Sequence, residues 1–117
     1  MSDMVKRFFD AWGESDKAKQ AGMIAEALSA DARYADPRTP EPLCGPEAVA
    51  GYVAQFTEMA PGGVADTVDV ATSDGVIRAT IEFRMSDGMA QLGQYFVEAD
   101  AHGKLTRLVG FVGNGAL

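Results

Sequence analysis

Hydrophobic positions in the first part of the chain recur with the spacing of α-helices. Near the N-terminus, four apolar residues fall on one helical stripe: Val5, Phe8, Phe9 and Trp12. Gly13 weakens this helix, and either Ser15 or Asp16 can cap the next one. The second helix presents an inward face of three apolar residues: Ile24, Ala27 and Leu28. Two helices are therefore predicted before the short extended segment ARYADP, which places Tyr34 between small residues.

A third helix carries clear signals at both of its ends. Gly45 can serve as its N-cap, and Pro46 fits the first helical position, where its missing N–H costs nothing. Apolar residues then follow at helical spacing along one face: Val49, Tyr52, Val53, Phe56 and Ala60. The sequence PGG at 61–63 ends the helix.

From residue 64 onward the pattern changes to a period of two. In VIRATIEFRM, five apolar residues alternate with polar ones: Ile77, Ala79, Ile81, Phe83 and Met85. Three pairs mark hairpin turns: Asp74-Gly75, Asp87-Gly88 and His102-Gly103. Four strands are predicted, at about 64–72, 76–86, 89–99 and 105–113. Helices followed by an antiparallel meander indicate an α+β fold, in a single domain over residues 1–117.

The predicted strands are long, so the sheet should curl. Helices packed on its concave side then leave a hollow between the two layers. The strand AQLGQYFVEA is largely apolar on both faces, with Phe96 on one face and Tyr95 and Val97 on the other. One face meets the helices, and we expect the other to be covered by a second copy in a homodimer. The alternative is a scatter of ordinary surface apolar residues.

Composition narrows the classes of function. The chain has 117 residues and a formal net charge of −7, which argues against nucleic acid or an anionic membrane as a partner. No apolar run approaches the length of a membrane span, and the N-terminus does not resemble a signal peptide, so we expect a cytoplasmic protein. With Cys44 and His102 as the only cysteine and histidine, we expect no metal and no other cofactor.

Asp36 is the first candidate for chemistry. It ends the extended segment and stands directly before Pro37, which keeps Asp36 out of the α region. Loops at the ends of strands often carry function. An aspartate before a proline is also ordinary turn chemistry, so the residue pattern leaves both interpretations open.

Two segments, ALSADARYADPRTPEPLCGPEAVAGYVAQF and GQYFVEADAHGKLTRLVGFVG, resemble the nuclear transport factor 2-like superfamily, in particular its SnoaL-like and ketosteroid-isomerase-like branch. The resemblance covers nearly the whole chain. It implies a cone-shaped half-barrel, a cystatin-like α+β roll in which a curved antiparallel sheet wraps around three N-terminal helices and which is commonly dimeric. The superfamily includes isomerases, cyclases and non-catalytic binding domains, so the fold alone does not decide the function.

The resemblance also implies site residues. In ketosteroid isomerases the proton-transferring base is an aspartate before a proline at the end of a short strand, which Asp36 and Pro37 match. The family's two oxyanion donors are a tyrosine of the first helix and a protonated aspartic acid of the meander. Those positions hold Phe8 and Tyr95 here, so one donor is lost and the other becomes a phenol. This departure argues against steroid isomerisation itself.

We therefore expect Asp36 to act as a general base and Tyr95 to bind a substrate carbonyl in one apolar cavity. The expected lining of that cavity is Phe8, Trp12, Tyr34, Tyr52, Phe56, Val97, Leu108 and Val112. Such a site suits a cofactor-free isomerase or cyclase acting on a small hydrophobic carbonyl compound. Two alternatives stay open: a non-catalytic pocket for a small apolar ligand, and a dimeric interaction module whose interior is filled by its own aromatic side chains.

Overall fold

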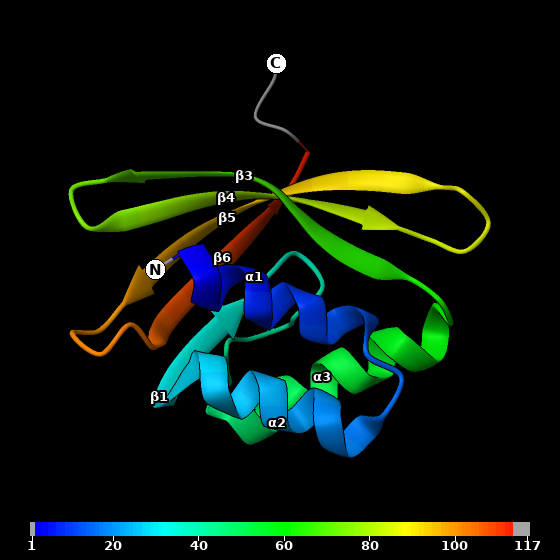
Figure 1. The fold of residues 1–117 in the computed structure, drawn as a ribbon, viewed down its shortest axis with the longest axis horizontal. Helices are drawn as coiled ribbons and strands as arrows, with labels where there is room; N and C mark the ends of the chain where they lie inside the picture. The colour runs from blue at the N-terminus through cyan, green and yellow to red at the C-terminus, as the bar shows by residue number, and fades with distance from the viewer. Residues whose placement is uncertain (1, 114–117) are drawn as a thin grey trace.

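Three helices lie on one side of a curved six-stranded sheet in the computed structural model, which describes residues 2–113 (Figure 1). The helical elements are α1 (Ser2–Asp10), the 3-10 helix η1 (Ala11–Gly13), α2 (Lys17–Ala27) and α3 (Pro46–Met59). The strands are β1 (Leu28–Ala35), β2 (Leu43–Cys44), β3 (Val64–Ser73), β4 (Val76–Arg84), β5 (Ala90–Ala99) and β6 (Leu105–Val112). The predicted α+β half-barrel is confirmed, with the sheet left unclosed.

The strands are arranged in the order β2-β1-β6-β5-β4-β3. Strands β3 to β6 form the antiparallel meander that the period of two predicts. Strand β1 pairs antiparallel with β2 but parallel with β6, where Tyr34 lies beside Leu108. The sheet is therefore mixed, whereas the resemblance implied an antiparallel one. The single parallel pair joins β1, which precedes the meander in the chain, to β6, the last strand of the meander.

The ends of the elements follow their local chemistry. Asp16 caps α2, where its Oδ1 accepts a hydrogen bond from the backbone N–H of Lys19 at 3.1 Å. Leu28 corrects one prediction: α2 ends at Ala27, and Leu28 is extended and opens β1, although it is buried as expected. None of the helices within residues 2–113 is long and apolar enough to cross a membrane.

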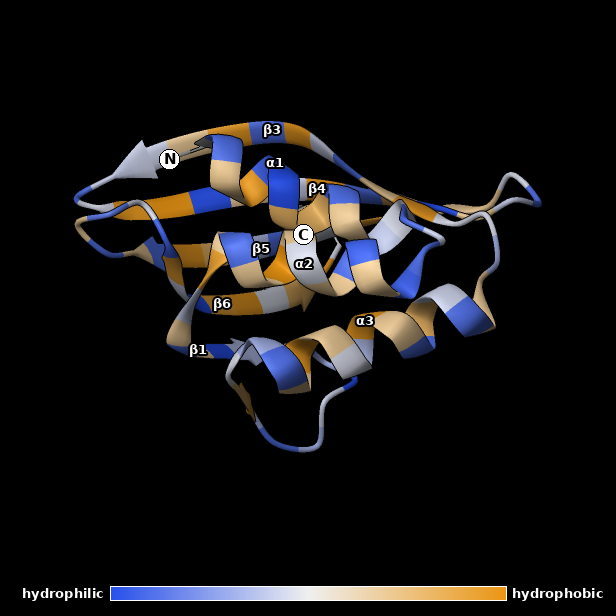
Figure 2. Ribbon diagram, turned by 60° about the horizontal axis from the view of Figure 1, so that its bottom comes forward, coloured by the Kyte–Doolittle hydropathy of each residue, from blue (hydrophilic) through white to orange (hydrophobic). Residues whose placement is uncertain are grey.

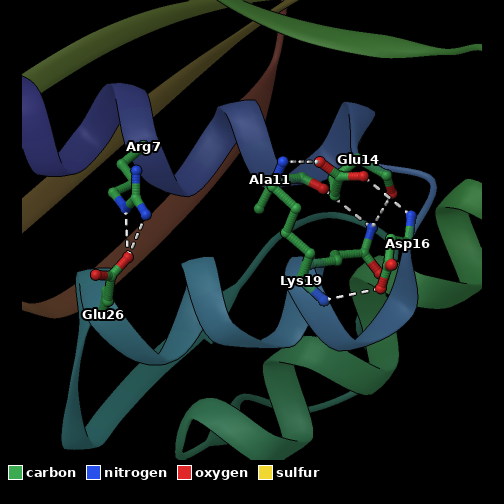
Figure 3. A network of polar contacts seen from close by, with 7 residues as sticks. Arg7, Ala11, Glu14, Asp16, Lys19 and Glu26 are labelled. Carbon is green, nitrogen blue, oxygen red and sulfur yellow. Dashed lines mark hydrogen bonds and ion pairs between the residues drawn. The ribbon is translucent and has the colours of Figure 1, made fainter.

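Polar contacts hold the helices to one another. Arg7 of α1 donates from Nε to Glu26 of α2 at 2.6 Å (Figure 3). Gln20 of α2 is buried, and its Nε2 donates to the carbonyl of Ala11 at 3.0 Å and to Oγ1 of Thr57 at 2.8 Å. This one side chain therefore links η1, α2 and α3.

The core lies between the helices and the inner face of the sheet. The predicted apolar stripe of the first helix is buried: Val5, Phe8, Phe9 and Trp12. The inward positions of β4 and β5 are buried as well: Ile77, Ala79, Ile81, Tyr95 and Val97. Phe96, on the opposite face of β5, is 51% exposed. In Figure 2, hydrophobic and hydrophilic segments alternate along α1 and α2, as expected for helices with one face toward the core.

Candidate active site

Asp36 sits where β1 ends and the proline-rich loop begins. Its Oδ1 accepts hydrogen bonds from two backbone N–H groups of that loop, Arg38 at 2.8 Å and Thr39 at 3.1 Å. The backbone N–H of Asp36 in turn donates to Oγ1 of Thr39 at 3.1 Å. One carboxylate oxygen therefore serves the turn, as the Asp-Pro pair predicts. The other oxygen, Oδ2, is left to face the interior.

Two phenols bind that second oxygen. The Tyr34 hydroxyl donates to Oδ2 of Asp36 at 2.6 Å, and the Tyr52 hydroxyl donates to the same atom at 2.7 Å. Tyr34 stands two residues before Asp36 on the extended chain, so both side chains leave on the same side. Tyr52 reaches the carboxylate from α3.

The third phenol joins through Tyr34. The hydroxyls of Tyr34 and Tyr95 lie 2.8 Å apart. Because the single hydroxyl proton of Tyr34 is donated to Asp36, Tyr95 is the donor in this pair. A directed chain of hydrogen bonds therefore runs from Tyr95 through Tyr34 to Asp36. Together with Tyr52, these residues form the Asp36–tyrosine cluster, which contains all three tyrosines of the chain.

Burial keeps these tyrosines in their neutral form. Tyr34 is fully buried and Tyr95 is 4% exposed, whereas Tyr52 is half-buried. Desolvation raises the pKa of Tyr34 well above its ordinary value, and the neighbouring Tyr95 and Asp36 raise it further. Burial likewise raises the pKa of Tyr95 and of Tyr52, with the hydrogen bond to Asp36 adding to the effect on Tyr52. All three hydroxyls are therefore available as donors at neutral pH.

A glycine of β6 makes room for the cluster. Gly110 is the register partner of Tyr95 on the neighbouring strand. A Cβ atom at Gly110 would lie 2.6 Å from the Tyr95 ring and 3.2 Å from the Cβ of Asp36. Both side chains thus occupy space that any larger residue at this position would need.

Most of the predicted lining residues form a packed aromatic cluster rather than an open cavity. Trp12 lies at its centre, with neighbouring ring centroids 5.1 to 6.2 Å away, belonging to Phe8, Phe9, Tyr34, Tyr52, Phe56 and Phe83. Phe9 and Phe83 were not among the predicted lining residues, although the helical stripe and the strand alternation pointed them inward. The hollow expected between the layers is filled at this point by these rings, which pack edge-to-face or tilted.

The remaining lining residues divide between the core and the rim. Val97 and Leu108 are buried on the inner face of the sheet. Val112 does not line a closed interior as predicted, since it is 64% exposed. It is the last residue of β6, opposite Gly93, and so lies at the end of its strand.

The Asp36–tyrosine cluster and the rings beside it are not uniformly buried. Asp36, Tyr52, Phe56 and Phe83 are half-buried, whereas Phe8 and Tyr34 behind them are fully buried. Two shallow hollows lie on the described residues, and the second includes Tyr34 of the cluster in its lining. One of about 460 Å³ is lined by Ala25, Leu28, Ser29, Ala30, Pro46, Asp100, His102 and Lys104. The other, of about 370 Å³, is lined by Arg33, Tyr34, Ala35, Pro42, Arg107, Leu108 and Val109.

The curved mixed sheet over three helices defines a nuclear transport factor 2-like fold. The family model for the SnoaL-like domain matches residues 5–110, and the chain therefore belongs to the SnoaL-like family. No curated protein matches the sequence.

Solved structures share this fold at low sequence identity. A SnoaL-like family protein from Agrobacterium tumefaciens, provisionally named an isomerase, has a TM-score of 0.86 at 19% identity and covers 97% of each chain. A protein with a ketosteroid isomerase-like fold from Catenulispora acidiphila, solved with trimethylamine, has a TM-score of 0.78 at 12% identity, over 95% of this chain and 85% of that one. A protein from Jannaschia sp. CCS1, provisionally named a SnoaL-like polyketide cyclase, has a TM-score of 0.78 at 14% identity. The match covers 95% of this chain and 83% of that one. These identities show a shared fold only.

Proposed function

We propose that the protein moves a proton next to the carbonyl group of a small apolar compound, as a cofactor-free isomerase or cyclase with Asp36 as the base. The observation that carries this proposal is the hydrogen-bonded chain from Tyr95 through Tyr34 to Asp36, at the partly exposed side of an aromatic interior. A carboxylate and three phenols are costly to desolvate, and apolar residues of similar volume would serve stability alone at least as well. The provisional names of two similar structures, an isomerase and a polyketide cyclase, are consistent with this chemistry.

Asp36 accepts a proton only after one donor leaves its carboxylate. Its acceptor positions are engaged by the N–H groups of Arg38 and Thr39 and by the hydroxyls of Tyr34 and Tyr52. Tyr52 is the half-buried phenol among these donors. In the proposed mechanism the substrate enters beside Tyr52, displaces its hydroxyl from Oδ2 of Asp36, and presents a C–H bond in its place.

Protonation of Asp36 then reverses the hydrogen-bond chain. The electron pair of the broken C–H bond moves into the substrate carbonyl, which becomes an enolate, and the proton passes to Oδ2. Protonated Asp36 donates to Tyr34, Tyr34 turns its own proton toward Tyr95, and the Tyr95 hydroxyl is released to bind the enolate oxygen. Return of the proton to another carbon yields an isomer. Alternatively, the enolate carbon attacks a second carbonyl of the same molecule, and the alkoxide so formed takes the proton back from Asp36, which yields a ring.

Exchange of carbon-bound hydrogen tests the proposal. Isophorone, a cyclic enone, is incubated with the protein in D2O, and loss of its exchangeable C–H signals is followed by NMR. We expect Asp36→Asn to slow the catalysed exchange by roughly 10²-fold or more, the usual contribution of a general base. Asp31→Asn, which changes an exposed aspartate of the preceding strand β1, serves as the matched control and should leave the rate unchanged. Equal rates for wild type and Asp36→Asn would refute the assignment.

A second candidate is non-catalytic binding of a small organic cation in the same cluster. Aromatic faces together with a carboxylate suit a trialkylammonium group, and the Catenulispora acidiphila structure was solved with trimethylamine. In that case wild type would catalyse no exchange of isophorone, and Asp36→Asn would weaken the binding of trimethylammonium measured by calorimetry.

A further inference from the structure

Trp12 carries a polar group that the proposed proton transfer does not use. Its side chain is 3% exposed, and its Nε1–H finds no hydrogen-bond acceptor within residues 2–113. Buried donors are almost always partnered, because an unpartnered donor loses its bond to water without replacement. A partner supplied by a bound molecule would remove this deficit.

The indole packs against the two phenols that bind Asp36. Its ring centroid is 6.2 Å from that of Tyr34 and 6.1 Å from that of Tyr52, the two phenols bound to Asp36. Its centroid also lies 5.1 Å from that of Phe56 and 5.5 Å from that of Phe83, two rings that are half-buried. A molecule that enters between these phenylalanines and the tyrosines therefore meets Trp12 as well as Asp36.

We propose that Trp12 Nε1–H binds a second hydrogen-bond acceptor of the substrate. The inference rests on the proposed function, which places the reacting carbonyl beside Asp36 and Tyr95. Because the indole packs directly against both phenols that bind Asp36, one compact molecule can contact Asp36 and Trp12 together. The ligand class is therefore a compact apolar ring compound with two oxygen acceptors. Trp12 determines specificity, because an analogue without the second oxygen leaves the buried N–H unpaired.

Two ketones that differ by one carbonyl test this inference. Isophorone has a single carbonyl, and ketoisophorone carries a second one across the same kind of methylated ring. We expect ketoisophorone to bind about fivefold more tightly, the factor that one neutral hydrogen bond supplies. Because Trp12 is the only tryptophan, the protein gives one indole N–H resonance. That proton should move downfield with ketoisophorone and much less with isophorone.

Two variants separate the hydrogen bond from the packing. Trp12→Phe should abolish the fivefold preference, because it removes the donor. Phe56→Leu, which alters a neighbouring ring that has no polar atom, should weaken both ketones alike and keep the preference. Should Trp12→Phe fail to fold, the indole resonance of the wild type decides the question.

The outcomes distinguish this inference from the proposed function. Equal affinities with an unmoved indole resonance overturn the role of Trp12, even where Asp36→Asn abolishes exchange. A fivefold preference that depends on Trp12, in a protein that catalyses no exchange, supports the binding role and refutes the proton transfer. Binding of neither ketone refutes both.

Discussion

At the scale of single residues, Asp36 and the three tyrosines behave as one unit because they share hydrogen bonds. The pKa of every tyrosine in the chain is raised, chiefly by burial. Tyrosine normally ionises near pH 10. We therefore expect no tyrosine of the folded protein to ionise at that ordinary value.

This cluster gives the stability a defined dependence on pH. Groups whose pKa is raised in the folded state contribute stability that is complete below the ordinary value and is lost as pH rises above it. The free energy of unfolding, measured with urea, should therefore not vary with pH through these tyrosines below about pH 10 and should fall above it. The ultraviolet absorbance of tyrosinate should appear only together with unfolding. A tyrosine that ionises near pH 10 in protein still folded would contradict the burial described here.

Gly110 offers a second prediction at this scale. Gly110→Ala puts a Cβ against the ring of Tyr95 and near Asp36, so it should lower the free energy of unfolding by about 1–3 kcal/mol, as overpacking does. The matched control is Gly51→Ala in α3, where an added Cβ meets nothing within 4 Å. This control should raise stability by up to about 1 kcal/mol, since alanine favours helix. Similar losses from both variants would show that crowding at Gly110 is not the cause.

At the scale of elements, Gln20 connects three helical segments. Gln20→Ala removes its bonds to Ala11 and Thr57 and leaves a small cavity. We expect it to lower the free energy of unfolding by about 2–4 kcal/mol. Gln55→Ala, an exposed glutamine of α3, should change stability by less than about 0.5 kcal/mol. Urea denaturation of both variants provides the measurement, and an effect at Gln20 no larger than at Gln55 would refute the linking role.

Elements with a clear period were predictable from the sequence. The hairpin at Asp74 and Gly75 forms as expected, with φ values of 50° and 77°. Strand β2 has two residues, too few to show any period, and the parallel pairing of β1 with β6 depends on contacts remote in sequence. A chain that alternates locally carries no information about which distant strand it joins.

The candidate site was predictable in part, because some of its contacts are local in sequence and others are remote. Asp36 and Tyr95 were paired by resemblance, but the structure places Tyr34 between them. The spacing of two between Tyr34 and Asp36 carried that signal, because it puts both side chains on one side of an extended chain. The helical spacing placed Tyr52 on the inward face and among the lining residues, but nothing in the sequence predicted its bond to Asp36, which depends on α3 docking beside the end of β1.

At the scale of the whole molecule, the outer face of the sheet is partly apolar. Phe96 and Phe111 are 51% and 50% exposed, and their ring centroids lie 5.6 Å apart. Val109 is the register partner of Phe96 on the same face. We propose that a second copy of the chain covers this face.

Light scattering after gel filtration tests the proposed homodimer. Wild type should elute as a dimer at micromolar concentration, and Phe96→Glu should shift it to the monomer because a charge would be buried at the interface. Met59→Glu places the same charge at a residue of α3 that is 84% exposed and should leave the dimer intact. A wild-type protein that elutes as a monomer would refute the proposed homodimer.

The dense filling around Trp12 also has a kinetic consequence. The rings of Tyr52 and Phe56 occupy the volume that a bound ligand needs. A ligand can therefore bind only while these two side chains are displaced from the cluster. In stopped-flow experiments the observed binding rate should therefore reach a plateau as ligand concentration rises. The plateau equals the rate at which the two side chains move aside, not the rate of diffusional encounter.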